Sequence, residues 1–139
     1  MPKWIFNAKI DNIEKCNQII EEQCGNLNFL PKEINQVQLA MEEAVVNIIK
    51  HAYGNDESQE FSMEMNRTDN DNKSGILLRF TDTGPFFNPL EKKDPDTHLA
   101  LEEREIGGLG ILMIKQMMDE LDYQRLDEQN VFSMIKYKQ

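Results

Sequence analysis

The sequence predicts an α+β fold, a two-layer α/β sandwich in which helices cover one face of a mostly antiparallel sheet. Hydrophobic periodicity gives the element order β-α-α-β-β-α-β-β, and the last four strands are expected in two hairpins. Hairpins pair antiparallel, and helices grouped among them cover one face of the sheet. The 139 residues fit one domain, residues 1–139.

The first half of the chain is expected to form one strand and two helices. Apolar alternation over residues 4–8 indicates a short strand. The first helix is expected to start at an N-cap, Asp11 or Asn12, and to be closed by Gly25. A longer helix is expected over residues 31–53, where a Gly-Asn pair follows as its stop.

The second half is expected to form a hairpin, a helix and a second hairpin. Between the first hairpin and the helix lies an irregular segment of more than twenty residues that is rich in proline and glycine. A loop of this length in a compact domain is usually functional, and a lid over a ligand is a common case. The expected bounds are strands 60–66 and 75–81 around a polar tip at 68–74, a helix over 109–121, and strands 122–126 and 131–136 around a turn at 127–130.

Charge and composition exclude several classes of function. A net charge of -10 repels nucleic acid and anionic lipid, and it is compatible either with docking onto a basic protein surface or with simple solvation. No apolar run approaches the roughly 20 residues of a membrane span, and residues 1–12 lack the apolar centre of a secretory signal. We therefore expect a cytoplasmic chain whose two cysteines, Cys16 and Cys24, are reduced packing residues.

The helix expected over residues 31–53 carries a polar row beside its apolar face. Glu43, Asn47 and His51 are spaced four residues apart along one edge of the apolar arc. Glu42 projects from the opposite edge, so helix geometry selects Glu43 as the carboxylate that can act together with Asn47. The apolar arc consists of Val37, Met41, Ala44, Val45, Ile48, Ile49 and Ala52.

This row has two interpretations. A carboxylate such as Glu43 can accept a proton from a hydroxyl, and an amide oxygen such as that of Asn47 can ligate Mg²⁺. The alternative is a solvated helix rim. His51, near the helix end, is expected to act as a cap or to hydrogen bond at the rim rather than to serve as a ligand or base.

Two glycine segments follow. Asp82 stands at the end of a strand with Gly84 two residues later, so its carboxylate could accept a hydrogen bond from the ring amino group of adenine. The alternative is a plain Asp-x-Gly-Pro turn. Gly107, Gly108 and Gly110 lead into a helix, whose N-terminus favours a phosphate if the segment is not simply a hinge.

In this order and with this spacing, the three segments resemble the N, G1 and G2 boxes of the GHKL ATPase superfamily, which has the Bergerat ATP-binding fold. Within it the chain is most similar to the bacterial anti-sigma-factor serine/threonine kinases. The resemblance spans about residues 4–137. The matching segments are residues 43–53, 82–89 and 107–121, and Asn130-Val131 before the last strand also fits.

The resemblance implies roles for individual residues. Glu43 would be the general base, Asn47 the magnesium ligand, Asp82 the adenine anchor and Gly84 the residue that gives the ring room. Residues 88–106 would be the ATP lid. Further nucleotide contacts would be His51, Phe87, Gly107, Gly108, Leu109 and Gly110, together with Arg104 on the lid, whose alternative is a solvated charge.

The resemblance also implies a function. The chain would use ATP and Mg²⁺ to phosphorylate a STAS-type antagonist and would hold a sigma factor until that antagonist competes, acting as a homodimer. The alternatives are a nucleotide-binding module that switches partners without phosphorylating them, and a catalytic fragment that works with a separate histidine-bearing chain. Phe86 and Asn88 depart from the usual G1 pattern and could change the entry to the lid.

Overall fold

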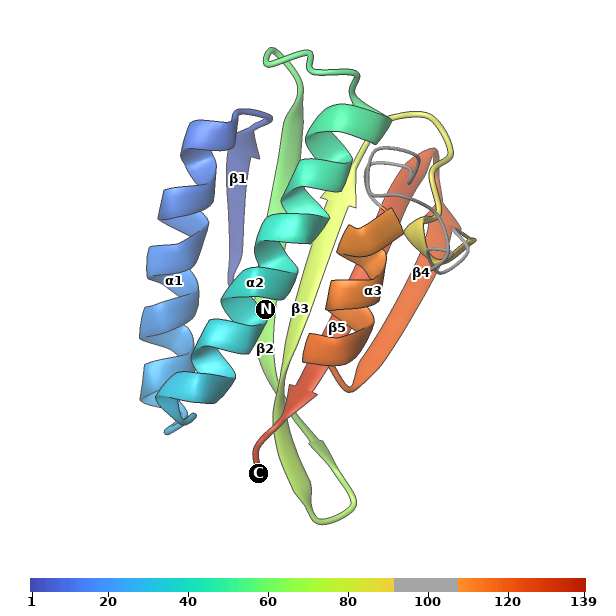
Figure 1. Cartoon of the computed structure of the whole chain (residues 1–139). Helices are drawn as coiled ribbons and strands as arrows, with labels where there is room; N and C mark the ends of the chain where they lie inside the picture. The colour runs from blue at the N-terminus through green and yellow to red at the C-terminus, as the bar shows by residue number, and fades with distance from the viewer. Residues whose placement is uncertain (92–107) are drawn as a thin grey trace.

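The computed structural model describes residues 1–91 and 108–139, and five strands in them form one antiparallel sheet. The strand order is β1-β2-β3-β5-β4, so β5 lies between β3 and β4 although it follows both in the chain (Figure 1). This order brings the start of β5 beside the end of β3. The strands are β1 (Lys3–Asn7), β2 (Glu60–Asn70), β3 (Lys73–Asp82), β4 (Glu120–Leu126) and β5 (Gln129–Tyr137).

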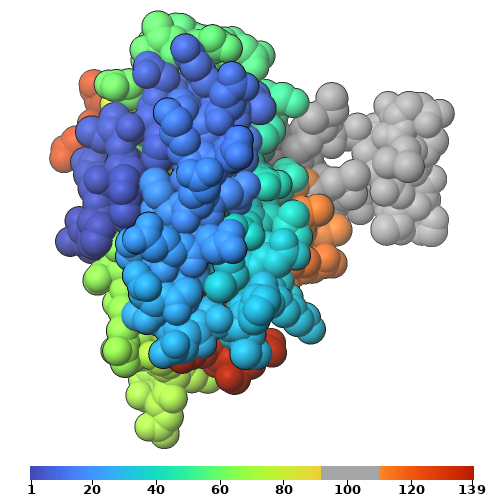
Figure 2. Space-filling model, turned by 90° about the vertical axis from the view of Figure 1, so that its left-hand side faces the viewer, coloured from blue at the N-terminus to red at the C-terminus, as the bar shows by residue number. Residues whose placement is uncertain are grey.

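Helices α1 (Ile13–Asn26), α2 (Pro31–Asn47) and α3 (Gly108–Met117) cover one face of this sheet (Figure 1). α2 lies in the middle and contacts both α1 and α3. The predicted α+β class, with helices on one face of an antiparallel sheet, is therefore confirmed. Figure 2 shows α1 and the start of α2 side by side on the surface.

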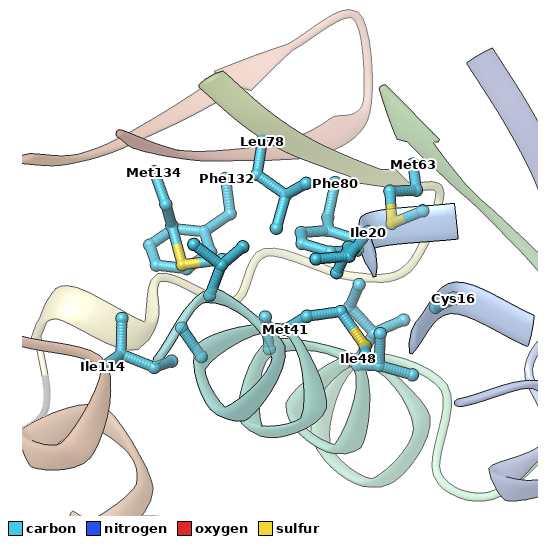
Figure 3. Close-up of a cluster of buried hydrophobic side chains, with 14 of the residues drawn as sticks. Cys16, Ile20, Met41, Ile48, Met63, Leu78, Phe80, Ile114, Phe132 and Met134 are labelled. Carbon is cyan, nitrogen blue, oxygen red and sulfur yellow. The ribbon is translucent and has the colours of Figure 1, made fainter. Parts of the chain in front are cut away.

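The core fills the space between the sheet and the helices (Figure 3). Met41 and Ile48 project from the α2 side toward the strands, and the predicted apolar arc of this helix is buried. Along β5, buried and half-buried residues alternate, as expected for a strand with one face against the core. The labelled strand side chains in Figure 3 are Met63, Leu78, Phe80, Phe132 and Met134, and the other labelled side chains include Cys16 and Ile20 from α1 and Ile114 from α3.

The tip of the first hairpin is strand rather than loop, which corrects the expectation for residues 68–74. β2 and β3 stay paired as far as Asn70 and Lys73, and Asp71 in the turn has a φ of 54°. This tip projects beyond the helices (Figures 1 and 2). Neither face of the two-stranded ribbon packs against the core at this tip, so both faces carry polar residues. The sequence there lacks the alternation of apolar and polar residues that indicates a strand, and its composition resembles that of a loop.

The ends of α1 differ in detail from the prediction. Asn12 precedes the helix as expected, but its side chain donates to the carbonyl oxygen of Asn7 at 2.8 Å and makes no cap hydrogen bond. Gly25 lies inside the helix. The chain turns instead at Asn28, whose φ of 63° is in the left-handed region that asparagine tolerates.

The long second helix is not α-helical throughout. α2 ends at Asn47 and continues as a π-helical turn, η2 (Ile48–Ala52), before Gly54 and Asn55 reverse the chain with positive φ angles. A π-turn spreads one turn over an additional residue, and such turns are frequent at functional sites. The turn changes the direction in which His51 projects compared with a straight α-helix.

α3 is shorter than expected because β4 starts earlier. The helix ends at Met117, and the N–H of Asp119 donates to the carbonyl of Ile135 at 2.8 Å. Leu121, which continues the helical period of the sequence, instead pairs with Met134 in the sheet. Strand pairing therefore outweighs the helical pattern at this boundary.

Both cysteines are buried and free, in agreement with the prediction of reduced packing residues. Burial raises the pKa of Cys16 to about 12, and burial followed by the charge of Glu33 raises the pKa of Cys24 to about 12. Neither thiol is a reactive nucleophile at neutral pH. In the two described segments, no helix has the length and apolar character needed to cross a membrane.

Candidate functional site

Asp82 ends β3 as a buried carboxylate, 5% exposed. The N–H of Gly84 and the side-chain amide of Asn130 both donate to its Oδ1 at 2.9 Å. Burial raises the pKa of Asp82, while the hydrogen bonds from Asn130 and Gly84 and the charge of Arg125 oppose this increase. A buried carboxylate whose orientation is fixed by a few hydrogen-bond donors can accept a hydrogen bond from a ligand in one defined direction.

A narrow pocket of about 20 Å³ lies beside Asp82, between α2 and the ends of the strands. Asn47, Asp82 and Asn130 place polar groups in it from three different elements. This volume holds about one water molecule, so a purine ring needs the walls to move apart. The pocket is lined by Ala44, Asn47, Ile48, Phe80, Asp82, Phe87, Pro89, Tyr123, Asn130 and Phe132.

Glu43 and Glu42 project to opposite sides of α2, as the helix geometry predicts. Oε1 of Glu42 accepts a hydrogen bond from Asn17 of α1 at 3.1 Å. Oε2 of Glu43 lies against Gly110, so close that a Cβ at Gly110 would collide with it. Burial, followed by the charge of Glu42, raises the pKa of Glu43, and Lys50 opposes the increase.

Gly108 and Leu109 begin α3, and Gly110 is buried on its first turn. Because Gly110 touches Glu43, this helix start and the polar edge of α2 share one site. Arg104 and Gly107 lie outside the described residues, as does most of the expected lid, residues 92–106.

His51 stacks on Phe87, which is one of the residues that line the pocket. Their rings stack with centroids 5.3 Å apart and an interplanar angle of 19°. The π-turn carries His51 to this position, and Phe87 also lines the pocket. Phe86, one of the departures from the family pattern, contacts the ring of Tyr123 edge-on, and Asn88, the other, accepts from the N–H of Leu90.

Gly84 is required by a close approach of two backbones. A Cβ at this position would lie 2.6 Å from the carbonyl oxygen of Ala52, at the end of the π-turn. Tyr53 holds the same junction, because its hydroxyl accepts from the N–H of Thr83 at 2.8 Å and donates to the carbonyl of Glu60. The room that Gly84 would give an adenine ring stays a prediction.

Asn130 fits the family resemblance, but the sequence pattern assigns it no role at the site. It is 3% exposed and stands opposite Asp82 in the β3–β5 register. A signal was present in the sequence, because Asn130 starts an inward-facing row that continues with Phe132 and Met134. An amide in such a row has to be satisfied by partners, which marks it as part of a polar network.

The described residues offer one feature suited to magnesium. Among residues 1–91 and 108–139, no three His, Cys, Asp or Glu side chains cluster as a metal centre. Mg²⁺ in phosphoryl-transfer sites is commonly held by one or two protein oxygens together with substrate phosphates. Asn47, whose amide lines the pocket, fits such a site as a single ligand.

The antiparallel sheet with helices on one face, with a polar pocket at its strand ends, is the α+β arrangement expected from the sequence. The model of one family, the histidine kinase-like ATPase domain, matches residues 6–136. The chain therefore belongs to this family, which confirms the resemblance stated above.

Two curated relatives carry more specific names. A serine-protein kinase, RsbW, of Listeria innocua is 28% identical over 97 residues, which cover 67% of this chain and 59% of that protein. An anti-sigma F factor of Clostridium perfringens is 26% identical over 117 residues, which cover 84% of this chain and 81% of that one. The chain thus spans about three fifths of the Listeria relative.

A solved structure agrees in fold. The RsbU and RsbW domains of a Mycobacterium tuberculosis protein superpose on the whole of this chain with a TM-score of 0.62, at 12% identity and over 33% of that chain. This likeness concerns the fold alone.

Proposed function

We propose that this chain is an ATP-dependent serine/threonine protein kinase of the anti-sigma-factor type. The observation that carries the proposal is the contact between Glu43 and Gly110, because it joins a carboxylate of raised pKa to the start of α3. A helix start attracts phosphate, and a carboxylate beside it can act on a nucleophile directed at that phosphate. The names of the Listeria and Clostridium relatives support the same activity.

In the proposed reaction, the hydroxyl of a serine or threonine attacks the γ-phosphorus of ATP. Its proton passes to the carboxylate of Glu43 as the new oxygen–phosphorus bond forms, and ADP leaves with the electrons of the broken bond. The raised pKa of Glu43 suits this role, since a general base works best with a pKa near the operating pH. Asp82 would anchor the adenine, and Asn47 would hold Mg²⁺, which neutralises charge on the phosphates.

The proposed partners are a sigma factor and a STAS-type antagonist that carries the phosphorylated hydroxyl. The name of the Clostridium relative supports a sigma factor as one partner, and the net charge of -10 suits a basic protein surface. We propose a cytoplasmic homodimer on the resemblance to the anti-sigma-factor kinases.

The direct test is phosphoryl transfer. The protein is incubated with Mg²⁺ and labelled ATP beside each STAS-type protein of the same genome, with EDTA as the metal-free control. Label on a serine or threonine of one candidate, absent with EDTA, is the expected result. Nucleotide binding without transfer to any candidate would leave a partner-switching module, and absence of nucleotide binding would remove the ATP-dependent function altogether.

Gly110→Ala tests the contact that carries the proposal. The added methyl group would collide with Oε2 of Glu43, and the flexible carboxylate is expected to rotate away. We expect the transfer rate to fall by about tenfold or more, because small displacements of reacting groups are costly.

Gly25→Ala is the matched control, since a Cβ there meets nothing within 4 Å. It should keep the transfer rate and leave the free energy of unfolding unchanged or slightly higher, since Gly25 lies in the last turn of α1, where the helix preference of alanine counts for less. An unchanged rate in Gly110→Ala would contradict a catalytic role for the Glu43 carboxylate in its present position.

A further inference from the structure

Both polar atoms of the Asn130 side chain are engaged. Nδ2 donates to Oδ1 of Asp82 and to the carbonyl of Pro85, each at 2.9 Å. Oδ1 accepts from the N–H of Phe87 at 3.1 Å and from the hydroxyl of Tyr123 at 2.5 Å. One buried amide therefore links a strand end, the following loop and β4.

Arg125 completes this arrangement from β4. Its Nη1 donates to the carbonyl of Gly84 at 2.8 Å and to Oδ1 of Asn130 at 3.2 Å. Arg125 and Asn130 together thus hold three backbone groups of residues 84–87. The course of this loop is therefore set by the β4–β5 hairpin, and not only by the turn after β3.

The hydrogen bonds to Asp82 are unequal between its two oxygens. The donors from Gly84 and Asn130 both meet Oδ1, and neither of them occupies Oδ2. Without the amide of Asn130, the carboxylate could rotate about its χ2 torsion, which is broad for Asp. The acceptor presented to the pocket would then lose its fixed direction.

We infer that Asn130 is a positioning residue for base selection. By occupying Oδ1 and holding residues 84–87, it directs Oδ2 of Asp82 at the 6-amino group of an adenine nucleotide. This inference rests on the proposed function, because it requires a nucleotide to bind at Asp82. Asn130 makes no bond to the base in this scheme, and its effect passes entirely through Asp82.

The test compares ADP with inosine diphosphate, which has an oxygen in place of the 6-amino group. Isothermal titration calorimetry measures both dissociation constants, and their ratio reports the contact between Asp82 and the amino group. For the unaltered protein we expect ADP to bind about 100-fold more tightly. In Asn130→Ala this preference should shrink by about tenfold, mainly through weaker ADP binding.

Tyr123→Phe and Ser133→Ala complete the set. Tyr123→Phe removes one donor to Oδ1 of Asn130 and keeps the ring, so the preference should shrink by about two- to fivefold. If Asn130→Ala does not fold, the ADP preference of Tyr123→Phe tests the inference in its place. Ser133→Ala is the matched control on the same strand, because it removes a hydrogen bond to Arg79 on the other face of the sheet and should leave the preference unchanged.

The outcomes separate this inference from the proposed function. An equal loss of affinity for both nucleotides in Asn130→Ala would indicate a purely structural residue and overturn the inference. So would an unchanged preference in Asn130→Ala, or in Tyr123→Phe if only that variant folds. If the unaltered protein binds no nucleotide, the proposed function and the inference both fail.

Discussion

Replacing Glu43 by glutamine is expected to lower the rate of phosphoryl transfer by about 10²- to 10⁴-fold, the range typical of a lost general base. Glutamine has the same shape and can keep the contact with Gly110, but it cannot take up the proton of the attacking hydroxyl. ADP affinity should stay within about twofold, because the carboxylate acts on the transfer step. Single-turnover transfer from labelled ATP and calorimetry with ADP measure the two effects.

Glu42→Gln is the matched control for this variant. It changes the neighbouring residue by the same atoms and the same charge, but that side chain accepts a hydrogen bond from Asn17 on the far side of α2. Its transfer rate should be close to that of the unaltered protein. Equal losses in the two variants would mean that the net charge of the helix matters, and that Glu43 has no individual role.

The same residue predicts a pH dependence. Because burial raises the pKa of Glu43, the carboxylate takes up a proton at a higher pH than an ordinary glutamate. Since a general base must be unprotonated, the transfer rate should fall as the pH drops through that raised pKa. A pH profile that falls only near the pKa of a solvent-exposed glutamate would contradict the assignment.

Asp82→Asn is expected to weaken ADP binding by about 100-fold or more. The asparagine oxygen can take the place of Oδ1 and accept from Gly84 and Asn130. Its NH₂ group then faces the pocket, where it would oppose the amino group of adenine, donor against donor. The expected loss combines a missing hydrogen bond to a charged acceptor with an unpaired buried donor.

Thermal stability distinguishes this effect from unfolding. Burial raises the pKa of Asp82 in the folded protein, so above that pKa the ionised carboxylate lowers the free energy of unfolding. Asparagine carries no charge, and Asp82→Asn should therefore leave the melting temperature at pH 7 unchanged or higher. Asp122→Asn, an exposed carboxylate on β4, makes the same charge change and should keep ADP affinity. A stable Asp82→Asn protein with unchanged ADP affinity would remove Asp82 from the proposed site.

Sequence periodicity predicts those parts of the site that depend on a single helix or a single strand. Helix geometry separates Glu43 from Glu42 because the angle per residue sets which edge of the apolar face each side chain borders. The structure places them on opposite sides as predicted. The end of β3 at Asp82 follows from a strand pattern that stops there.

Features that depend on pairing between distant segments could not be predicted in the same way. Asn130 becomes a partner of Asp82 only through the β3–β5 register, which no local pattern specifies. The shortened end of α3 has the same cause, because Leu121 fits a helix until Met134 pairs with it. The π-turn after Asn47 could not be predicted either, since its residues fit the pattern of an ordinary α-helix.

The position of β5 in the sheet has a consequence for the order of folding. Asp82 and Asn130 are 48 residues apart, and they meet only when β5 of the second hairpin pairs with β3 of the first. Pairing across such a separation is slow compared with the closing of either hairpin. A chain in which both hairpins have formed but β3 and β5 are not yet paired has no complete pocket. A nucleotide that binds there would stabilise only the chain in which the two hairpins are joined, so nucleotide binding would mark the completed fold.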